Sequence, residues 1–309
     1  MILSQCAISL EDGANLSTEQ FIYLDHKNLV SQHKAERMDS LKDKVVVITG
    51  VGQGIGRALA QLMAKQGAKL ALNSRTPANL DETVNLLGLD ESRVFSRAFD
   101  ISDKDAVFQF AEEVKQHYGH VDVVINNAGV AMGGLTFEEC DISDFEWIFS
   151  INYMGVLYMT KAFLPQLRAQ NSETALVNVS SLFGMVPMAL KTPYCSTKYA
   201  VRGLTDSLRM ELLDTKVNVI GVYPGGVKTS ITTAARKAEQ EPEYAQTFDK
   251  LLVMPPEEAA QIIADGILKG KEDVIVGSDA KKAIFAYRWF PSALNKMALK
   301  TMRQFKSGK

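Results

Sequence analysis

The sequence predicts an α/β fold in which one doubly wound, seven-stranded parallel sheet has helices on both faces. Two observations predict it. From residue 43 to residue 278, short apolar segments alternate with longer segments whose apolar positions recur with the period of a helix. Several of the short segments are apolar at every position, as strands covered by helices on both faces must be.

Seven segments have the length and composition of strands, and they read KVVVITG, KLALNS, RVFSRAFD, VDVVINN, TALVNVS, VNVIGVY and DVIVG. About six helices are predicted between and around them. The first of these helices places one apolar stripe on one face, formed by Ile55, Ala58, Leu59, Leu62 and Met63. Strand and helix in repeated alternation imply right-handed crossovers, and therefore a parallel sheet.

Composition excludes several classes of protein. The 309 residues carry a net charge of −2 and are 46% hydrophobic, which is typical of a globular chain and does not favour a nucleic-acid partner. No apolar run reaches the length of about 18 residues that a membrane-spanning helix needs. Three cysteines, at positions 6, 140 and 195, lack disulfide or metal spacing, so a reducing, cytoplasmic compartment is expected and no metal is predicted.

Three regions are predicted along the chain. Residues 38–278 form the folded domain, and residues 1–37 have no basic segment typical of a secretory signal. We interpret residues 1–37 as a loosely ordered extension, or as sequence upstream of the true start. Residues 279–309 carry eight basic residues, one aspartate and interleaved aromatics. This basic amphipathic extension either lies peripherally in a membrane interface or covers the substrate entrance or a subunit contact.

A glycine cluster, TGVGQGIG from Thr49 to Gly56, directly follows the first predicted strand. Glycine permits a tight turn and lets the backbone approach a pyrophosphate, and the N-terminus of the next helix offers unpaired N–H groups to phosphate. The spacing differs from G-x-G-x-x-G, but its place between strand and amphipathic helix predicts a dinucleotide site in a Rossmann fold. The candidate cofactor-binding residues are Gly50, Gly52, Gln53, Gly54, Ile55 and Gly56.

The end of the second predicted strand, LALNSRT, should select the dinucleotide. An acidic side chain there would bind the ribose 2′-hydroxyl of NAD, whereas this chain has Ser74 followed by Arg75. No carboxylate repels a 2′-phosphate at this position, and a guanidinium is available to bind it. We therefore predict NADP(H) as the cofactor, with NAD(H) as the alternative if Arg75 is only a solvated loop residue.

Tyr194 is followed four residues later by Lys198, in a segment predicted to be helical. The two side chains share a helix face, so the lysine charge should favour the phenolate and lower the tyrosine pKa from about 10. A phenol adjusted in this way can give a proton to a carbonyl oxygen or take one from an alcohol. The pair alone is common in helices, and an exposed pair without function is the alternative.

Six segments occur in the order TGVGQGIG, INNAGV, INYMG, VNVSS, YCSTK and YPGGVKT. Each is weak alone, but together they resemble the short-chain dehydrogenase/reductase family in its compact single-domain form, over about residues 44 to 278. The resemblance implies an NAD(P)-dependent oxidoreductase acting on CH–OH or C=O groups. It also implies a homodimer or homotetramer, paired through the helices predicted at 144–164 and 194–212.

The resemblance implies four catalytic residues. Tyr194 would be the general acid/base, and Lys198 would lower its pKa and hold the nicotinamide ribose. Ser181, thirteen residues before Tyr194, would bind the substrate oxygen, and Asn152 would hold a water that passes protons to Lys198. Further cofactor contacts are implied at strand ends, by Asp100, Ile101, Asn127, Ala128, Gly129, Pro224, Gly225, Val227 and Thr229. Gln53 departs from the family pattern, because many NADP-dependent members have a basic residue there.

These features predict an NADP(H)-dependent enzyme that transfers a hydride between cofactor and a carbonyl or alcohol substrate. The apolar segment at residues 182–190 and the aromatic extension favour a hydrophobic ketone, aldehyde or acyl derivative. The polar segment at 229–252 is interpreted as a cover over this substrate, or as a surface helix pair. The alternatives are an NAD-dependent alcohol dehydrogenase and, from another class, a non-catalytic cofactor-sensing protein.

Overall fold

The structure is a computed structural model that describes residues 37–240, 242–292, 295–296 and 299, with the side chains of 242–245 left out. The extension predicted at residues 1–37 lies outside this range except for its last residue. Most of the chain after residue 292 lies outside it as well.

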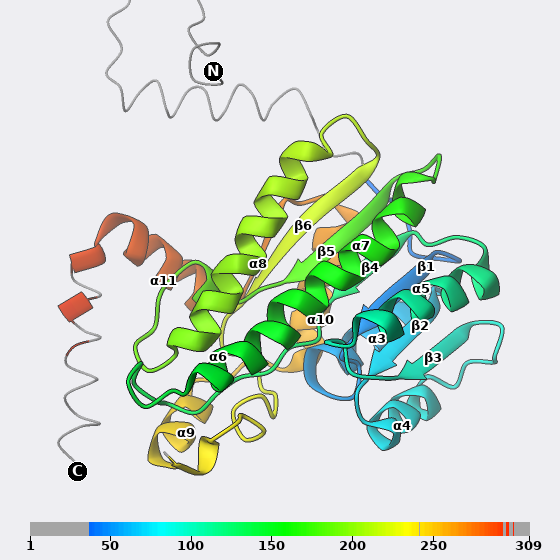
Figure 1. Ribbon diagram of the computed structural model, residues 1–309. Helices are drawn as coiled ribbons and strands as arrows, with labels where there is room; N and C mark the ends of the chain where they lie inside the picture. Colours follow the sequence, from blue (N-terminus) through cyan, green and yellow to red (C-terminus); the bar gives the residue numbers. More distant parts are fainter. Residues whose placement is uncertain (1–36, 241, 293–294, 297–298, 300–309) are drawn as a thin grey trace, which may run out of the picture. The chain divides into compact units, whose positions relative to one another are not determined.

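Seven strands form one sheet in the described part of the chain, and every neighbouring pair is parallel (Figure 1). Their bounds are β1 Val45–Thr49, β2 Lys69–Ser74, β3 Val94–Ala98, β4 Val123–Asn126, β5 Thr174–Val179, β6 Val217–Pro224 and β7 Asp273–Val276. The spatial order is β3-β2-β1-β4-β5-β6-β7, so the order reverses between β1 and β4. The predicted fold class and all seven predicted strands are confirmed, and the reversal marks the place where doubly wound folds bind ligands.

Alternate residues of the central strands enter two separate cores, one on each face of the sheet. On one face, Val46 and Ile48 of β1 pack with helices α3 (Gly54–Lys65) and α10 (Pro256–Leu268). On the other face, Val45 and Val47 pack with α5 (Lys104–Tyr118) and α7 (Gly155–Arg168). All four of these valine and isoleucine side chains are fully buried, as expected for a strand covered on both sides.

The helix predicted over residues 144–164 is interrupted in the structure. Helix α6 (Ile142–Phe149) passes through one π-helical turn, Ser150–Met154, into α7. A π-turn inserts one extra residue per turn and often lies at functional sites. The remaining helices of the described residues are α4 Pro77–Leu87, α8 Thr192–Glu211, α9 Pro242–Asp249 and α11 Ser278–Trp289.

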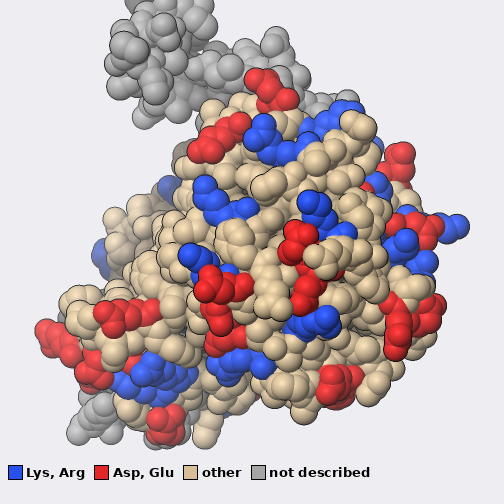
Figure 2. All heavy atoms as spheres, turned by 45° about the vertical axis from the view of Figure 1, so that its right-hand side comes forward, with Lys and Arg blue, Asp and Glu red and all other residues tan. Residues whose placement is uncertain are grey.

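The surface carries charges of both signs. On the face shown in Figure 2, lysine and arginine are interspersed with aspartate and glutamate, without a field of a single sign. No helix of the described residues is both long and apolar enough to span a bilayer.

Candidate active site

A cavity of about 660 Å³ lies at the carboxyl edge of the sheet, where β1 and β4 end. Among the predicted site residues, Asn152 is the one that does not line it; all the others do. Apart from Asn152, the predicted site residues come from seven separate segments of the sequence and surround this one cavity. Its size and its position at the strand-order reversal suit a dinucleotide with a small substrate beside it.

The glycine cluster turns tightly between β1 and α3 and forms one wall of the cavity. Gly50 has φ +70°, and a Cβ there would lie 2.7 Å from the Cα of Ala128. A Cβ at Gly56 would lie 2.2 Å from the carbonyl oxygen of Gly50, so helix α3 can begin this close to the turn only with glycine. Backbone N–H groups at the start of α3 are thus brought to the cavity, as pyrophosphate binding requires.

Arg57, which the sequence analysis did not single out, stabilises the glycine turn by joining it to helix α4 (Pro77–Leu87). Its guanidinium donates to the backbone oxygen of Gly52, to the Thr83 hydroxyl at 3.0 Å and to the Glu82 carboxylate at 2.7 Å. The Thr83 hydroxyl in turn donates to the carbonyl of Val51 at 2.9 Å. The position of Arg57 directly after Gly56, the last glycine of the cluster, is the sequence feature that could have identified it.

One end of the cavity is formed by the carboxyl ends of β2 and β3. Ser74 is buried, with its hydroxyl packed against Gly52, whereas Arg75 is exposed at the cavity wall. Helix α4 begins two residues later and has no acidic residue in its first turn. Asp100 accepts hydrogen bonds from the backbone and hydroxyl of Ser102, at 2.9 and 2.7 Å, and lines the same end together with Ile101.

Asn127, at the end of β4, ties this strand to β1. Its side chain donates to the carbonyls of Thr49 and Gly50, at 2.9 and 3.2 Å, and the Thr49 hydroxyl accepts from the backbone N–H of Ala128. These bonds fix the segment from Asn127 to Gly129 beside the glycine turn.

Asn152 lies in the π-turn, behind the cavity wall. Its amide oxygen accepts from the N–H of Val130 at 2.8 Å, and its amide nitrogen donates to the carbonyl of Val130 and the Thr197 hydroxyl, at 3.0 and 3.2 Å. A Cβ at Gly129 would lie 3.3 Å from the Asn152 oxygen and 3.4 Å from the Lys198 ammonium. The structure therefore brings Asn152 near Lys198, with its amide already bonded to the chain.

Ser181 follows β5 and lies beside Tyr194, which is in the first turn of α8. The two hydroxyl groups lie near enough for Ser181 to act against a rise in the pKa of the phenol, and the Ser181 hydroxyl accepts from the N–H of Phe183 at 3.1 Å. The neighbouring Ser180 hydroxyl is buried and donates to the backbone carbonyl of Lys198 at 2.8 Å, which fixes α8 to the end of β5.

Lys198 is buried, with its ammonium 5.6 Å from the centre of the Tyr194 ring and donating to the carbonyl of Val179 at 3.1 Å. Burial lowers the pKa of Lys198 to about 8. Burial also raises the pKa of Tyr194 to about 12, although the nearby Ser181 hydroxyl acts the other way. The expectation that the lysine charge would lower the tyrosine pKa is therefore wrong here, because desolvation of the phenol is the larger effect.

A further wall of the cavity comes from the end of β6. Pro224, Gly225, Val227 and Thr229 all line the cavity. The backbone N–H of Gly225 donates to Val276 of β7 at 2.9 Å, and the methyl group of Thr229 packs against Gly54. This segment therefore contacts the glycine turn through Thr229.

The segment at 229–252 continues from this wall over the cavity. Ile231, Thr232, Phe248 and Leu252 line it, which favours a cover over a separate surface helix pair. Three ion pairs join the segment to the start of α6. Lys237 contacts Asp141 and the buried Asp144 at 2.8 and 2.6 Å, and Arg236 contacts Asp144 at 3.4 Å.

Helix α11, in the C-terminal extension, has two different faces. Ala283 and Tyr287 line the cavity, whereas Phe285, Trp289 and Phe290 are 60–62% exposed. The extension therefore contributes to the cavity wall and also presents aromatic side chains to the outside.

In the described part of the chain, no group of three His, Cys, Asp or Glu side chains is arranged to hold a metal ion.

The chain is similar to a large group of known proteins. A family model described as short chain dehydrogenase matches residues 44–240. The oxidoreductase called SadH of Mycobacterium tuberculosis is 38% identical over 273 residues, which cover 87% of this chain and 98% of the relative.

Two solved structures show the same similarity. A short-chain dehydrogenase/reductase of Burkholderia phymatum in complex with NAD has a TM-score of 0.76 and 26% identity, covering 81% of this chain and 95% of that one. An alcohol dehydrogenase of Thermococcus sibiricus complexed with 5-hydroxy-NADP has a TM-score of 0.65 and 28% identity, covering 76% and 96%. Both kinds of dinucleotide therefore occur among similar proteins.

Proposed function

The chain belongs to the short-chain dehydrogenase/reductase family of NAD(P)-dependent oxidoreductases, and from this premise we propose that it reduces a hydrophobic carbonyl compound with NADPH, or oxidises the corresponding alcohol. One observation supports the proposal above all: the Tyr194 phenol and Ser181 line the same cavity as the glycine turn. The cavity's glycine wall fits a dinucleotide, because the tight turn that glycine allows at Gly50 and Gly56 brings the N-terminus of α3 to the cavity, where backbone N–H groups can bind a pyrophosphate.

Each catalytic side chain has a distinct role in this proposal. The cofactor, when bound, supplies or accepts the hydride. Ser181 and Tyr194 both bind the substrate oxygen and stabilise the negative charge that develops on it. Tyr194 gives its proton to that oxygen, and Lys198 holds the ribose and stabilises the phenolate that remains. A phenol is protonated at neutral pH, so Tyr194 can act as the proton donor when a carbonyl substrate is reduced.

Asn152 acts indirectly in this scheme. Its side-chain amide holds Val130 and Thr197, and thereby fixes the wall beside Lys198.

Replacing Tyr194 with Phe tests the proposal, because it keeps the ring and removes the proton. We expect kcat/KM for NADPH-dependent reduction to fall by at least about a hundredfold, the usual scale of general acid/base catalysis. Tyr199→Phe, at an exposed position on the same helix, is the matched control and should keep its activity. The measurement is NADPH oxidation over a panel of ketones, aldehydes and acyl thioesters.

Two outcomes would contradict the proposal. If Tyr194→Phe retained most of its turnover, the phenol would not be the proton donor. If the wild-type protein bound NADPH but reduced no member of the panel and oxidised no matching alcohol, the reading as a cofactor-sensing protein would be favoured instead.

Ser74 and Arg75 support NADP(H) as the cofactor. The serine is neutral and does not repel a 2′-phosphate, and the exposed guanidinium beside it can bind one. Ser74→Asp places a carboxylate at this position, so the ratio of kcat/KM for NADPH to that for NADH should fall by about tenfold or more. Ser172→Asp, at an exposed serine between α7 and β5, is the control. An unchanged ratio in Ser74→Asp would favour the alternative, an NAD-dependent alcohol dehydrogenase.

The cytoplasmic location, the homodimer or homotetramer and the peripheral membrane contact are further parts of this proposal. The exposed aromatics of α11, together with the exposed Lys281 and Lys282, support contact with an anionic membrane surface. Sedimentation with anionic vesicles at low salt tests it, and absence of binding would dismiss it. The mass of the protein in solution, measured by light scattering, tests the oligomer.

A further inference from the structure

A cluster of four charged side chains joins the segment at 229–252, here called the cover segment, to the start of α6. The Asp144 carboxylate is fully buried at the centre of this cluster. Lys237 contacts this carboxylate at 2.6 Å, and Arg236 contacts it at 3.4 Å. Lys237 also contacts the exposed Asp141 at 2.8 Å. These four residues form the ion-pair cluster.

The backbone of the cover segment is fixed at the same place. The N–H of Arg236 donates to the carbonyl of Ala131 at 3.1 Å, and the N–H of Gly133 donates to the carbonyl of Arg236 at 2.9 Å. Lys237 has φ +60°, in the left-handed region that residues other than glycine rarely adopt. Such a conformation persists only where the surrounding contacts determine it. The ion-pair cluster and these hydrogen bonds therefore set the path of the chain at Arg236 and Lys237.

The cover segment supplies a mainly apolar part of the cavity wall, on both sides of the ion-pair cluster in the sequence. Ile231, Thr232, Phe248 and Leu252 line the cavity. The Thr232 hydroxyl donates to the Asp249 carboxylate at 3.0 Å, so the two halves of the segment are joined between these side chains. An apolar part of a substrate can pack against this wall. The position of the wall depends on where the ion-pair cluster holds the segment.

Stability alone does not account for a fully buried carboxylate at the start of α6. Ion pairing offsets the desolvation of such a group only in part, and well-packed apolar side chains often stabilise a fold as much or more. A buried charge pair does fix the position of its partners, because moving either partner away leaves a charge without compensation where water is excluded. Asp144 therefore imposes one position on Arg236 and Lys237, and through them on the cover segment.

We propose that Asp144 is a positioning residue that holds the cover segment against the substrate, and that the enzyme thereby favours carbonyl compounds with a long apolar chain. This inference rests on the proposed function and deepens it. The substrate's carbonyl oxygen lies at Ser181 and Tyr194, and its apolar chain packs under the cover segment. Each methylene group that this wall removes from water strengthens binding by up to about fourfold, so the preference should grow with chain length.

A series of straight-chain methyl ketones, from butan-2-one to decan-2-one, tests the preference. The ketones differ only in the number of methylene groups, so any difference in kcat/KM reports on the apolar wall. In the wild-type protein with NADPH, kcat/KM should rise by at least about thirtyfold along the series, chiefly through a fall in KM. If kcat/KM were the same for all of these ketones, the proposal would be overturned.

The variant Asp144→Asn removes the buried charge and keeps an acceptor for the N–H of Asp141, which the carboxylate accepts at 3.0 Å. Its former partner Lys237 retains Asp141, so no unpaired charge is left buried. We expect kcat/KM for decan-2-one to fall by about tenfold, chiefly through KM, because the wall is no longer held against the chain. The value for butan-2-one and the KM for NADPH should each change less than about threefold.

Variants of the cation complete the series. Lys237→Met should lower the preference for decan-2-one in the same way, whereas Lys237→Arg keeps the charge and should keep most of the preference. Lys269→Met is the matched control, because it removes a surface ion pair with Asp265 at 3.9 Å. This control should change neither kcat/KM nor its dependence on chain length. Loss of the preference in Lys269→Met as well would overturn the assignment to the ion-pair cluster.

A purely structural role of Asp144 gives a different result. If the ion-pair cluster only stabilises the fold, Asp144→Asn lowers kcat/KM for every ketone by the same factor, or lowers the melting temperature without changing the dependence on chain length. Either result overturns the proposal.

Two measurements without turnover distinguish failure of this inference from failure of the proposed function. The N–H groups of Ala234 and Arg236 are hydrogen-bonded to the carbonyls of Ser230 and Ala131. In Asp144→Asn, amide hydrogen exchange of peptides covering these residues should be at least about tenfold faster than in wild type, while peptides from β1 and β4 stay unchanged. Unchanged exchange in the cover segment overturns the proposal, whether or not any ketone is reduced.

The second measurement is binding alone. With NADPH present, decan-2-one should raise the melting temperature of the wild-type protein more than butan-2-one does, and this difference should shrink in Asp144→Asn. A protein that met this expectation but reduced no ketone would contradict the proposed function and support the role of Asp144. An equal difference in wild type and Asp144→Asn overturns that role.

Discussion

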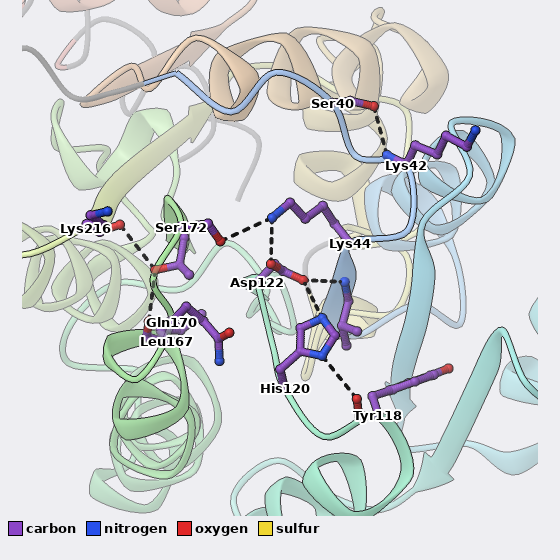
Figure 3. A network of polar contacts seen from close by, with 12 residues as sticks. Ser40, Lys42, Lys44, Tyr118, His120, Asp122, Leu167, Gln170, Ser172 and Lys216 are labelled. Carbon is purple, nitrogen blue, oxygen red and sulfur yellow. Dashed lines mark hydrogen bonds and ion pairs between the residues drawn. The ribbon is translucent and has the colours of Figure 1, made fainter.

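The two edges of the sheet hold buried charges in opposite ways. At the amino edge, the Asp122 carboxylate accepts from the backbone N–H of Val45 at 2.8 Å and contacts the Lys44 ammonium at 2.9 Å and the His120 ring at 3.3 Å (Figure 3). At the carboxyl edge, Lys198 is equally buried, but in the described part of the chain no carboxylate pairs with it.

This difference separates a structural charge from a functional one. The partners of Asp122 come from the residues around β1 and β4, so its bonds join two neighbouring strands where they begin. Lys198 has a carbonyl oxygen as its partner and a lowered pKa, which is unfavourable for the isolated fold. A group that destabilises the fold and yet lies at the catalytic edge is typical of a residue retained for its chemistry.

The largest effect should come from removing the functional charge. Lys198→Met leaves Tyr194 without a cation to stabilise its phenolate and removes a donor for the ribose. We expect kcat/KM to fall by at least about a hundredfold, while far-UV circular dichroism stays unchanged. Lys161→Met on the surface of α7 serves as the control. Turnover close to wild type in Lys198→Met would show that the buried charge at the carboxyl edge is not needed for catalysis, so the distinction between a structural and a functional charge would be wrong.

Removing the structural charge should have the converse effect. Asp122→Ala leaves the N–H of Val45 and the Lys44 ammonium without their acceptor, so the free energy of unfolding should fall by about 2–3 kcal/mol. Urea unfolding measures this loss, and kcat/KM below the transition should change less than about threefold. Asp265→Ala is the control, because the Lys269–Asp265 pair lies on the surface at 3.9 Å and should contribute less than about 1 kcal/mol. Equal losses in both variants would show that the Asp122 cluster is no more than a surface pair.

Much of the fold could be predicted, because its signal is local. Each strand is a short apolar run, and its observed bounds differ from the predicted ones by no more than two residues, as in β4, Val123–Asn126. The π-turn at Ser150–Met154 could not be predicted, since its side chains follow nearly the same periodicity as an α-helix. The extra residue appears only in the backbone hydrogen bonds.

The sequence predicted which residues line the cavity better than it predicted the pKa shifts of their side chains. Spacing indicated that Tyr194 and Lys198 share a helix face, but burial depends on what packs over them from distant segments. Phe183 and Phe248 close on the same region, and desolvation then raises the pKa of the phenol instead of lowering it. The burial of Lys191 could not be predicted for the same reason, since only tertiary structure shows that this lysine is buried.

The smallest effect concerns stability and pH. The folded-state pKa of Lys198 is about 8, whereas a lysine in the unfolded chain titrates at about 10.4. Between about pH 8 and pH 10 the unfolded chain therefore binds more protons than the folded protein, so the free energy of unfolding rises with pH in this window. Lys198→Met removes this contribution. From about pH 7.5 to 9.5, wild type should gain about 1–2 kcal/mol more than the variant.

The comparison with the variant is needed because two neighbours titrate nearby. Burial also lowers the pKa of Lys191, which adds to the rise, and raises the pKa of the Cys195 thiol, which opposes it. Both groups remain in Lys198→Met, so the difference between the two urea-unfolding series isolates Lys198. Parallel curves would mean that the ammonium is as well solvated as in the unfolded chain. Burial of the Lys198 ammonium would then not destabilise the fold. Lys198 and Asp122 would differ only in the groups that they contact.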